Sequence, residues 1–171
     1  VYNESRVGGF IGYTYGHTSY SKGQDIYEKC TSSADVEVSG NGTLGRTFVG
    51  SFVGAMNQSS KFTSCSATSD AEVKVTAKKF SNNLNVGWVG SCSSLESTAL
   101  YDFVSCTNSA VVNLNSEGFA AVNVSGLVGG NYVAADAPKA SKVNVTDCKV
   151  EGSVTIAGKT SANVMFGGLC Y

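Results

Sequence analysis

The chain has 171 residues, of which 42% are hydrophobic and 15% are charged, and its formal net charge is −1. This length and apolar content suffice for one domain with a packed core. The weak charge argues against a nucleic-acid partner, which needs a basic face, and no apolar run approaches the length of a membrane-spanning helix, so we expect no membrane insertion. Because the sequence opens at Val1 without a signal-like segment, we interpret it as a mature or excerpted chain.

A glycine-rich segment recurs along the sequence, first as VGGFIG and last as FGGLCY. Self-similarity at a fixed period of roughly 40 residues is typical of solenoids and other repeat architectures. The large apolar residue of the successive copies is Phe10, Phe52, Trp88, Leu127 and Leu169. The predicted repeats span 7–48, 49–84, 85–123 and 124–163, and 164–171 starts a fifth.

Two further segments recur in phase with the glycines. Each repeat has one cysteine that follows a large apolar residue by three positions, and these cysteines are Cys30, Cys65, Cys106 and Cys148. A short alternating segment comes next, in which apolar residues stand two apart, as do Val36 and Val38. Residues two apart lie on one face of a strand. Each repeat therefore predicts three short strands: the glycine-rich one, the one leading to the cysteine, and the alternating one.

Helices are disfavoured, because no window keeps a 3.6-residue period and β-branched and small polar residues abound. Three strands per repeat, together with the right-handed preference of parallel crossovers, predict an all-β fold. We expect a right-handed parallel β-solenoid (β-helix) of about four coils, with three short strands per coil. The main alternative is a β-sandwich. Equivalent positions carry equivalent residues in each repeat, which favours the solenoid.

The combination of a Gly-Gly-Phe/Leu-Val-Gly segment, an apolar residue three before a cysteine and a small-residue turn into Val-x-Val resembles the GLUG repeat. The resemblance covers nearly the whole chain, and it is looser in the third repeat, where one residue is missing beside Trp88. GLUG repeats occur in large secreted and surface-attached proteins, including adhesin-like ones. The resemblance implies a secreted or cell-surface repeat protein with a structural or adhesive role, and it supplies no catalytic residues.

The repeat cysteines are expected to stack in one column, because they hold the same repeat position. Two arrangements stay open: a ladder of small buried thiols, or vertical disulfides that join Cys30 to Cys65 and Cys106 to Cys148. The CxxC spacing of zinc sites is absent, so no metal site is predicted. Two further cysteines lie off the column and are expected to be free thiols or to bond another chain: Cys92 and Cys170.

Five Asn-x-Ser/Thr sequons mark candidate N-glycosylation sites, or else sequons that are never used. They begin at Asn3, Asn41, Asn57, Asn123 and Asn144. Asn123 and Asn144 each stand between two valines. Because alternate residues of a strand point to opposite faces, both asparagines are expected to face water.

Catalytic chemistry finds little support in the residues. His17 is the one histidine of the sequence, and we interpret it as a solvated loop residue in a polar stretch. No pair of carboxylates is singled out for glycoside cleavage. We therefore predict that the protein is not an enzyme and uses no cofactor, and we keep a solenoid carbohydrate-active enzyme as a third class.

The loops that follow the glycine-rich strands are predicted to leave the solenoid at one corner and to lie side by side. Insertions on one edge of a repeat array often form its binding face. This predicted edge carries Tyr13, Tyr15, His17, Tyr20, Tyr101 and Tyr132. These side chains either bind a partner or merely cover the coil edge.

The ends of the predicted stack carry no charged or proline-rich cap, although open strand edges template association. We therefore expect an extracellular structural repeat protein that self-associates end to end in a filament, stalk or surface coat. Its partners would be other copies of itself or adjoining repeats of a longer chain. The alternative is an adhesin or binding module that contacts host or matrix glycans or proteins.

Overall fold

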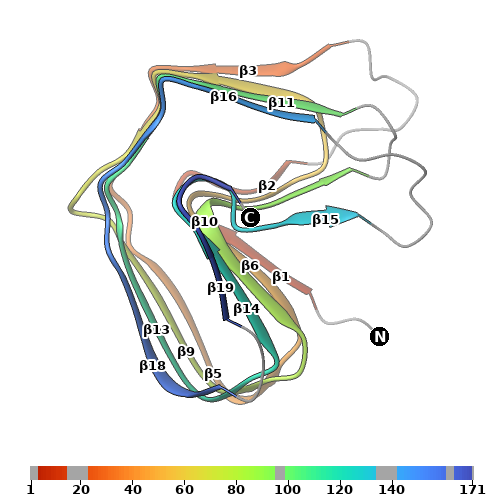
Figure 1. The fold of residues 1–171 in the computed structure, drawn as a ribbon, viewed down its shortest axis with the longest axis vertical. Coiled ribbons are helices and arrows are strands. Elements are labelled where there is room, and N and C mark those ends of the chain that lie inside the picture. The colour runs from red at the N-terminus through yellow and green to blue at the C-terminus, as the bar shows by residue number, and fades with distance from the viewer. Residues whose placement is uncertain (1–3, 15–22, 95–98, 134–141, 161–163, 171) are drawn as a thin grey trace.

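The computed structural model describes residues 4–14, 23–94, 99–133, 142–160 and 164–170. Every regular element within these ranges is a strand, and every strand pair is parallel. The chain forms a β-solenoid with four parallel sheets, and it passes from the first to the last strand of a sheet in about three turns (Figure 1). We call the four successive passes coils 1 to 4. The predicted all-β parallel solenoid is confirmed, and its handedness stays a prediction.

Sheet A contains the glycine-rich segments and runs through the middle of the cross-section (Figure 1). Its main path is β1 (Glu4–Gly8), β6 (Arg46–Met56), β10 (Asn83–Ser94), β14 (Ala121–Ser125) and β19 (Val164–Gly167). Two short strands extend it beside β6 and β10, namely β2 (Ile11–Thr14) and β15 (Asn131–Val133).

The other three sheets contain one strand from each coil. Sheet B leads to the cysteines and consists of β3 (Asp25–Glu28), β7 (Ser60–Thr63), β11 (Leu100–Val104) and β16 (Lys142–Thr146). Sheet C follows the cysteines and consists of β4 (Thr31–Ser32), β8 (Ser66–Ala67), β12 (Thr107–Asn108) and β17 (Lys149–Val150). Sheet D holds the alternating segments and consists of β5 (Val36–Leu44), β9 (Glu72–Phe80), β13 (Val111–Phe119) and β18 (Val154–Thr160).

Sheet C corrects the predicted number of strands per coil from three to four. The residue before each repeat cysteine has a left-handed backbone with φ between 52° and 54°, and these residues are Lys29, Ser64, Ser105 and Asp147. A left-handed residue interrupts an extended strand and turns the chain through a corner. All four are polar and exposed. The chain therefore leaves sheet B, turns a corner and starts a new short strand directly after the cysteine.

Strand register places equivalent residues of successive repeats in columns. Val36 pairs with Val73, Val73 with Val112, and Val112 with Val154. Val36, Val73 and Val112 belong to one core cluster, which also contains Val49 and Val86 of sheet A. The predicted alternating segments are confirmed, because their apolar residues share one face and line this core.

A second core cluster is built from stacked rings. The rings of Phe52 and Trp88 stack with centroids 4.4 Å apart, and those of Phe62 and Phe103 stack at 5.6 Å. Each of these four side chains is fully buried. Offset stacks of this kind contribute about 1 kcal/mol beyond the burial of their area. Parallel register therefore lines up aromatic residues as well as valines.

The third repeat is one residue shorter beside Trp88, and the register of β10 on β6 shifts at this point. Gly87 pairs with Gly50, but two residues later Val89 pairs with Val53, three residues beyond Gly50. Trp88 stands at this point and fills the interior against Phe52. The indole of Trp88, which is larger than the phenyl ring of Phe52, thus fills the interior where the strand is one residue shorter.

Close approach between coils requires glycine at Gly90. An added Cβ there would lie 2.5 Å from the Gly54 carbonyl oxygen and 2.6 Å from the Val49 nitrogen. We expect Gly90→Ala to lower the free energy of unfolding by about 1–3 kcal/mol, because the coils must shift apart. Gly23→Ala is the matched control, since nothing lies within 4 Å of its added Cβ. Urea unfolding of both variants checks this, and a Gly90→Ala protein as stable as its control would contradict the coil packing.

Candidate functional site

The two ends of the stack expose side chains that are buried inside it. In the aromatic column of the glycine-rich segments, Phe10 is 46% exposed and Leu169 is 43% exposed. Between them, the column residues of coils 2 to 4 are fully buried: Phe52, Trp88 and Leu127. The same side-chain type therefore changes from core to surface only because no further coil covers it.

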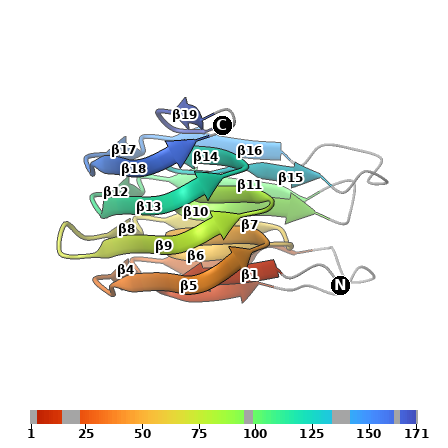
Figure 2. The same cartoon turned by 90° about the horizontal axis from the view of Figure 1, so that it is seen from below.

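The last coil shows this contrast in sheets C and D. Val154 is 41% exposed, whereas Val112, directly below it in the same column, is 4% exposed. Val150 is 39% exposed at the end of sheet C, and Phe166 of β19 is 62% exposed. Sheets B, C and D end at β16, β17 and β18 on this side and at β3, β4 and β5 on the other (Figure 2). Among the described strands, each terminal strand has one edge without a partner strand, which is a template for pairing.

Ionic contacts secure the first strand of the stack. Glu4 accepts a hydrogen bond from Arg46 at 2.6 Å and forms a second ion pair with Arg6. The Arg6 guanidinium lies over the ring of Tyr13, 4.1 Å from its centroid. Such cation–π contacts are worth on the order of 0.5–1 kcal/mol at exposed sites. β1 is therefore tied both to coil 2 and to β2.

The predicted tyrosine edge is corrected at Tyr101. Its side chain is fully buried, and its hydroxyl donates a hydrogen bond to the Met56 carbonyl at 3.3 Å. Tyr101 is thus a core residue and offers no binding surface. Tyr13 is half-buried beneath Arg6. The remaining predicted members lie outside the described residues or have only their backbone described: Tyr15, His17, Tyr20 and Tyr132.

The sequons divide between surface and interior. Asn41 and Asn144 are exposed, Asn57 is 8% exposed, and Asn3 lies outside the described residues. Asn123, which we expected to face water, is only 7% exposed, and its Nδ2 donates to the Asn85 Oδ1 at 2.8 Å. A glycan cannot be accommodated at a buried side chain, so the expectation for Asn123 is wrong.

The reason is that the inner strands of sheet A are buried on both faces. β6 is buried at every position from Thr47 to Met56. On the face away from sheet D, an added Cβ at Gly130 would lie 2.5 Å from the Asn85 Nδ2. The chain after β14 therefore lies against the asparagines. Alternation still points their side chains away from the valines, but toward more protein instead of water.

The four repeat cysteines lie in one column as free thiols. Three of the four thiols reach the backbone of the coil below: the Sγ of Cys65 donates to the Tyr27 carbonyl at 3.4 Å, and that of Cys106 donates to the Phe62 carbonyl at 3.6 Å. The Cys148 Sγ likewise donates to the Phe103 carbonyl at 3.5 Å. This geometry matches the thiol-ladder arrangement, in which small buried side chains bridge neighbouring coils.

Burial favours the protonated form of Cys65 and Cys106. It raises the pKa of Cys65, and it raises the pKa of Cys106 to about 12. Off the column, burial and then the nearby Cys170 raise the pKa of Cys92 well above its usual range. Cys170 is exposed and forms an isolated parallel bridge with Val128. Because the thiolate is the reactive form of cysteine, Cys65 and Cys106 are poor nucleophiles at neutral pH.

The raised pKa of Cys106 predicts a loss of stability in alkali. In the unfolded chain the thiol ionises near its ordinary value of 9.0, but in the folded protein it keeps its proton up to about 12. The unfolded state therefore binds fewer protons in this window, and the free energy of unfolding falls as pH rises. We expect Cys106→Ala to show a shallower fall than the parent protein between pH 9.0 and about 12, measured by urea unfolding in reductant. Identical slopes would contradict the buried thiol.

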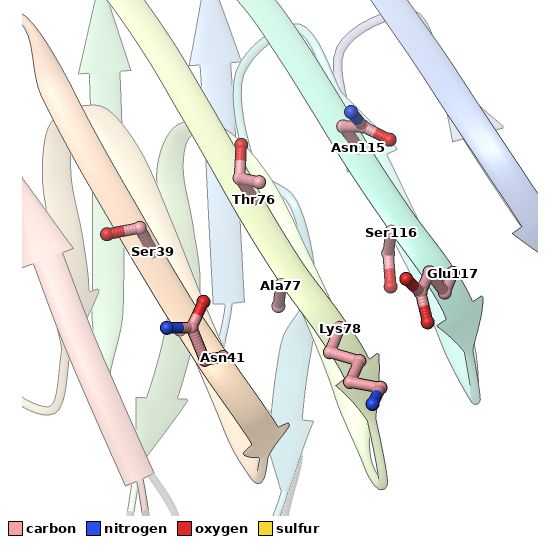
Figure 3. A pocket seen from close by; sticks show the side chains of 9 residues that line it. Ser39, Asn41, Thr76, Ala77, Lys78, Asn115, Ser116 and Glu117 are labelled. Carbon is pink, nitrogen blue, oxygen red and sulfur yellow. The ribbon is translucent and has the colours of Figure 1, made fainter.

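A polar hollow crosses the outer face of sheet D (Figure 3). It has a volume of about 580 Å³ and spans β5, β9 and β13. One row of its lining is the register column Ser39, Thr76 and Asn115. A second row, nearer the strand ends, contains Asn41, Lys78 and Glu117 (Figure 3). The hollow thus presents hydroxyl, amide and oppositely charged groups side by side.

We did not predict this hollow from the sequence, although a signal for it was there. Polar residues recur one position after the inward pairs of the alternating segments, as in Ser39 after Val38. The sequence does not reveal the irregular register of β5 on β9 between Gly40 and Thr43, at the side of the hollow.

Other kinds of site find no support in the described ranges. No group of three His, Cys, Asp or Glu side chains comes together there in a way that would hold a metal ion. No helix in this part of the chain is long and apolar enough to cross a bilayer.

Comparison of the chain with family models, with curated proteins and with solved structures gave no match. The class that the fold defines is a parallel β-solenoid repeat protein.

Proposed function

We propose that this chain is an extracellular structural repeat protein that joins end to end, as part of a filament, stalk or surface coat. The observation that carries the proposal is the column of glycine-rich segments, fully buried at Phe52 and Trp88 but about half exposed at Phe10 and Leu169. Burial of such large apolar side chains contributes about 1.5–3 kcal/mol each. Coverage of both ends is therefore the main stabilisation that the isolated stack lacks.

The internal coil contacts provide the template for this junction. Where coil 2 meets coil 3, β9 pairs with β13 and brings Val73 onto Val112. A second copy set on coil 4 would bring its Val36 onto Val154 in the same way, since both belong to one column. All sheets are parallel, so copies would join head to tail and leave the same face open for the next.

The proposed family and location are those that the repeat pattern implies. The glycine-rich, cysteine and alternating segments occupy equivalent positions in successive coils, which supports a GLUG-type repeat. The exposed sequons at Asn41 and Asn144 are compatible with a secreted or cell-surface protein. Neighbouring repeats of a longer chain would cover the ends as well as a second copy would.

Charge placed in an end column should weaken association strongly. We expect Val154→Lys to weaken self-association roughly 100-fold, because joining would bury an unpaired ammonium. Thr155→Lys is the matched control: it adds the same charge on the same strand, but in the outward column that contains Glu37. Sedimentation velocity over a dilution series checks this. Equal association of both variants, or a parent protein that is monomeric throughout, would contradict end-to-end joining.

A second candidate is a glycan- or protein-binding module, and the polar hollow of sheet D favours it. Its hydroxyl and amide groups suit the hydroxyls of a sugar. We expect Asn115→Ala to weaken oligosaccharide binding about 10-fold through lost hydrogen bonds. Asn113→Ala, on the same strand but outside the hollow, is the control. Saturation-transfer NMR with an oligosaccharide panel checks this, and no binding by the parent protein would eliminate the candidate.

A further inference from the structure

We call each level of a sheet, occupied by one strand, a rung. Within the described residues, the sheets of this solenoid do not end on the same rung. Sheets B, C and D contain four strands each, whereas the main path of sheet A contains five. The additional strand is β19, which pairs with β14 in parallel through Val124 and Phe166. This pairing continues the column that starts with Val7 and Val49 in β1 and β6. β19 therefore holds, one coil beyond coil 4, the place that β1 holds in coil 1.

This mismatch constrains any junction between two copies. For β3, β4 and β5 of an incoming copy to pair with β16, β17 and β18, its β1 must lie directly on β14. That rung is already filled by β19. If β1 instead stacked on β19, the other three sheets would face each other across an empty rung, which close packing does not tolerate.

We propose that two copies join by strand exchange, in which the segment Glu4–Thr14 of one copy displaces β19 from β14 of the other. The inference rests on the proposed function, because it specifies how the coil ends meet. The partner is a second copy of this chain. The segment comprising β19 and the residues up to Cys170 then acts as a plug that occupies the joining edge until an incoming β1 replaces it.

The described contacts indicate which strand gives way. In its own copy, β1 pairs with five residues of β6, and β2 pairs with three more. The Glu4–Arg46 ion pair adds a side-chain tie to coil 2. β19 pairs with four residues of β14, and the stretch after it adds one bridge, between Cys170 and Val128, and backbone hydrogen bonds to the Leu169 carbonyl. Even so, this segment makes fewer pairs than β1 and β2 together, and it leaves Phe166 62% exposed. The incoming strand keeps all of its own pairing, because it contributes only its free edge.

The buried asparagine column offers a specific partner for the incoming strand. Register places Arg6, Phe48, Asn85, Asn123 and Met165 in one column. Asn123 is 7% exposed, and its Oδ1 accepts no hydrogen bond. Met165, which lies above it, has a thioether and no donor, whereas a guanidinium carries five N–H donors. Exchange would set Arg6 of the incoming copy over Asn123 and supply the missing donor.

The apolar neighbours match as well. The incoming Val7 would take the place of Phe166 over Val124, and Ile11 would take the place of Cys170 over Val128. Phe10 would cover Leu127, as Leu169 does in the isolated chain. Three side chains that lie at or near the surface in separate copies would become part of a continuous core.

Photo-cross-linking of the full chain tests the exchange. Benzoylphenylalanine in place of Phe10 should give intermolecular cross-links to the stretch around Leu127, identified by mass spectrometry. The same probe in place of Lys74, an exposed residue on the side of coil 2, is the control and should give none. Cross-links from position 10 to Leu169 would overturn the exchange while leaving end-to-end joining intact. A chain that remains monomeric and gives no intermolecular product would overturn both proposals.

The Arg6 contact has its own test. Arg6→Met should weaken association about 10-fold, which is the loss expected for one hydrogen bond from a charged donor. Arg6→Lys retains a donor and should recover much of this loss. Thermal unfolding of the dilute monomer separates folding effects from association. An association constant unchanged by Arg6→Met would overturn the contact with Asn123.

Discussion

Parallel in-register pairing between coils is the constraint on which the rest of this structure depends. Each strand lies on its equivalent in the previous coil, so residues a repeat apart are neighbours in space. A side chain that suits the interior at one level must therefore suit it at every level. The valine columns, the stacked rings and the cysteine ladder all follow from this rule, and so does the need for glycine where coils approach most closely.

The same constraint makes the ends of the stack different in energy from its middle, although they are alike in sequence. A column residue in coil 2 or 3 is covered on both sides, while Phe10 and Val154 are covered on one. Edge strands leave backbone groups without partners, and apolar residues there leave area in water. The fold thus carries its own interaction surface. The additional strand of sheet A, β19, determines how that surface meets another copy. It covers the edge of β14 and leaves the edges of β16, β17 and β18 open.

Much of the fold could be predicted from the sequence, because the repeat itself encodes the columns. The alternating valines and the parallel stack followed from spacing alone. The extra corner before each cysteine could not be predicted. Left-handed backbone usually falls on glycine, but here it falls on residues such as Lys29 and Ser64. Tyr101 was misplaced because we assigned it to a loop, whereas it lies on β11 two residues before Phe103 and shares that residue's inward face. Asn123 was misplaced for a different reason. Alternation tells which face of a strand a residue occupies, but not whether a later segment of the chain covers that face.

The axial rise per copy in filaments of the native protein, measured by electron cryomicroscopy, tests the central claim most directly. If the columns continue through the junction with β1 in place of β19, each copy adds four rungs. The rise is then about 19 Å, four times the spacing of neighbouring strands. A rise of about 24 Å would mean that β1 stacks on β19 and that three sheets are interrupted. Particles that stay single at every concentration would contradict the account as a whole.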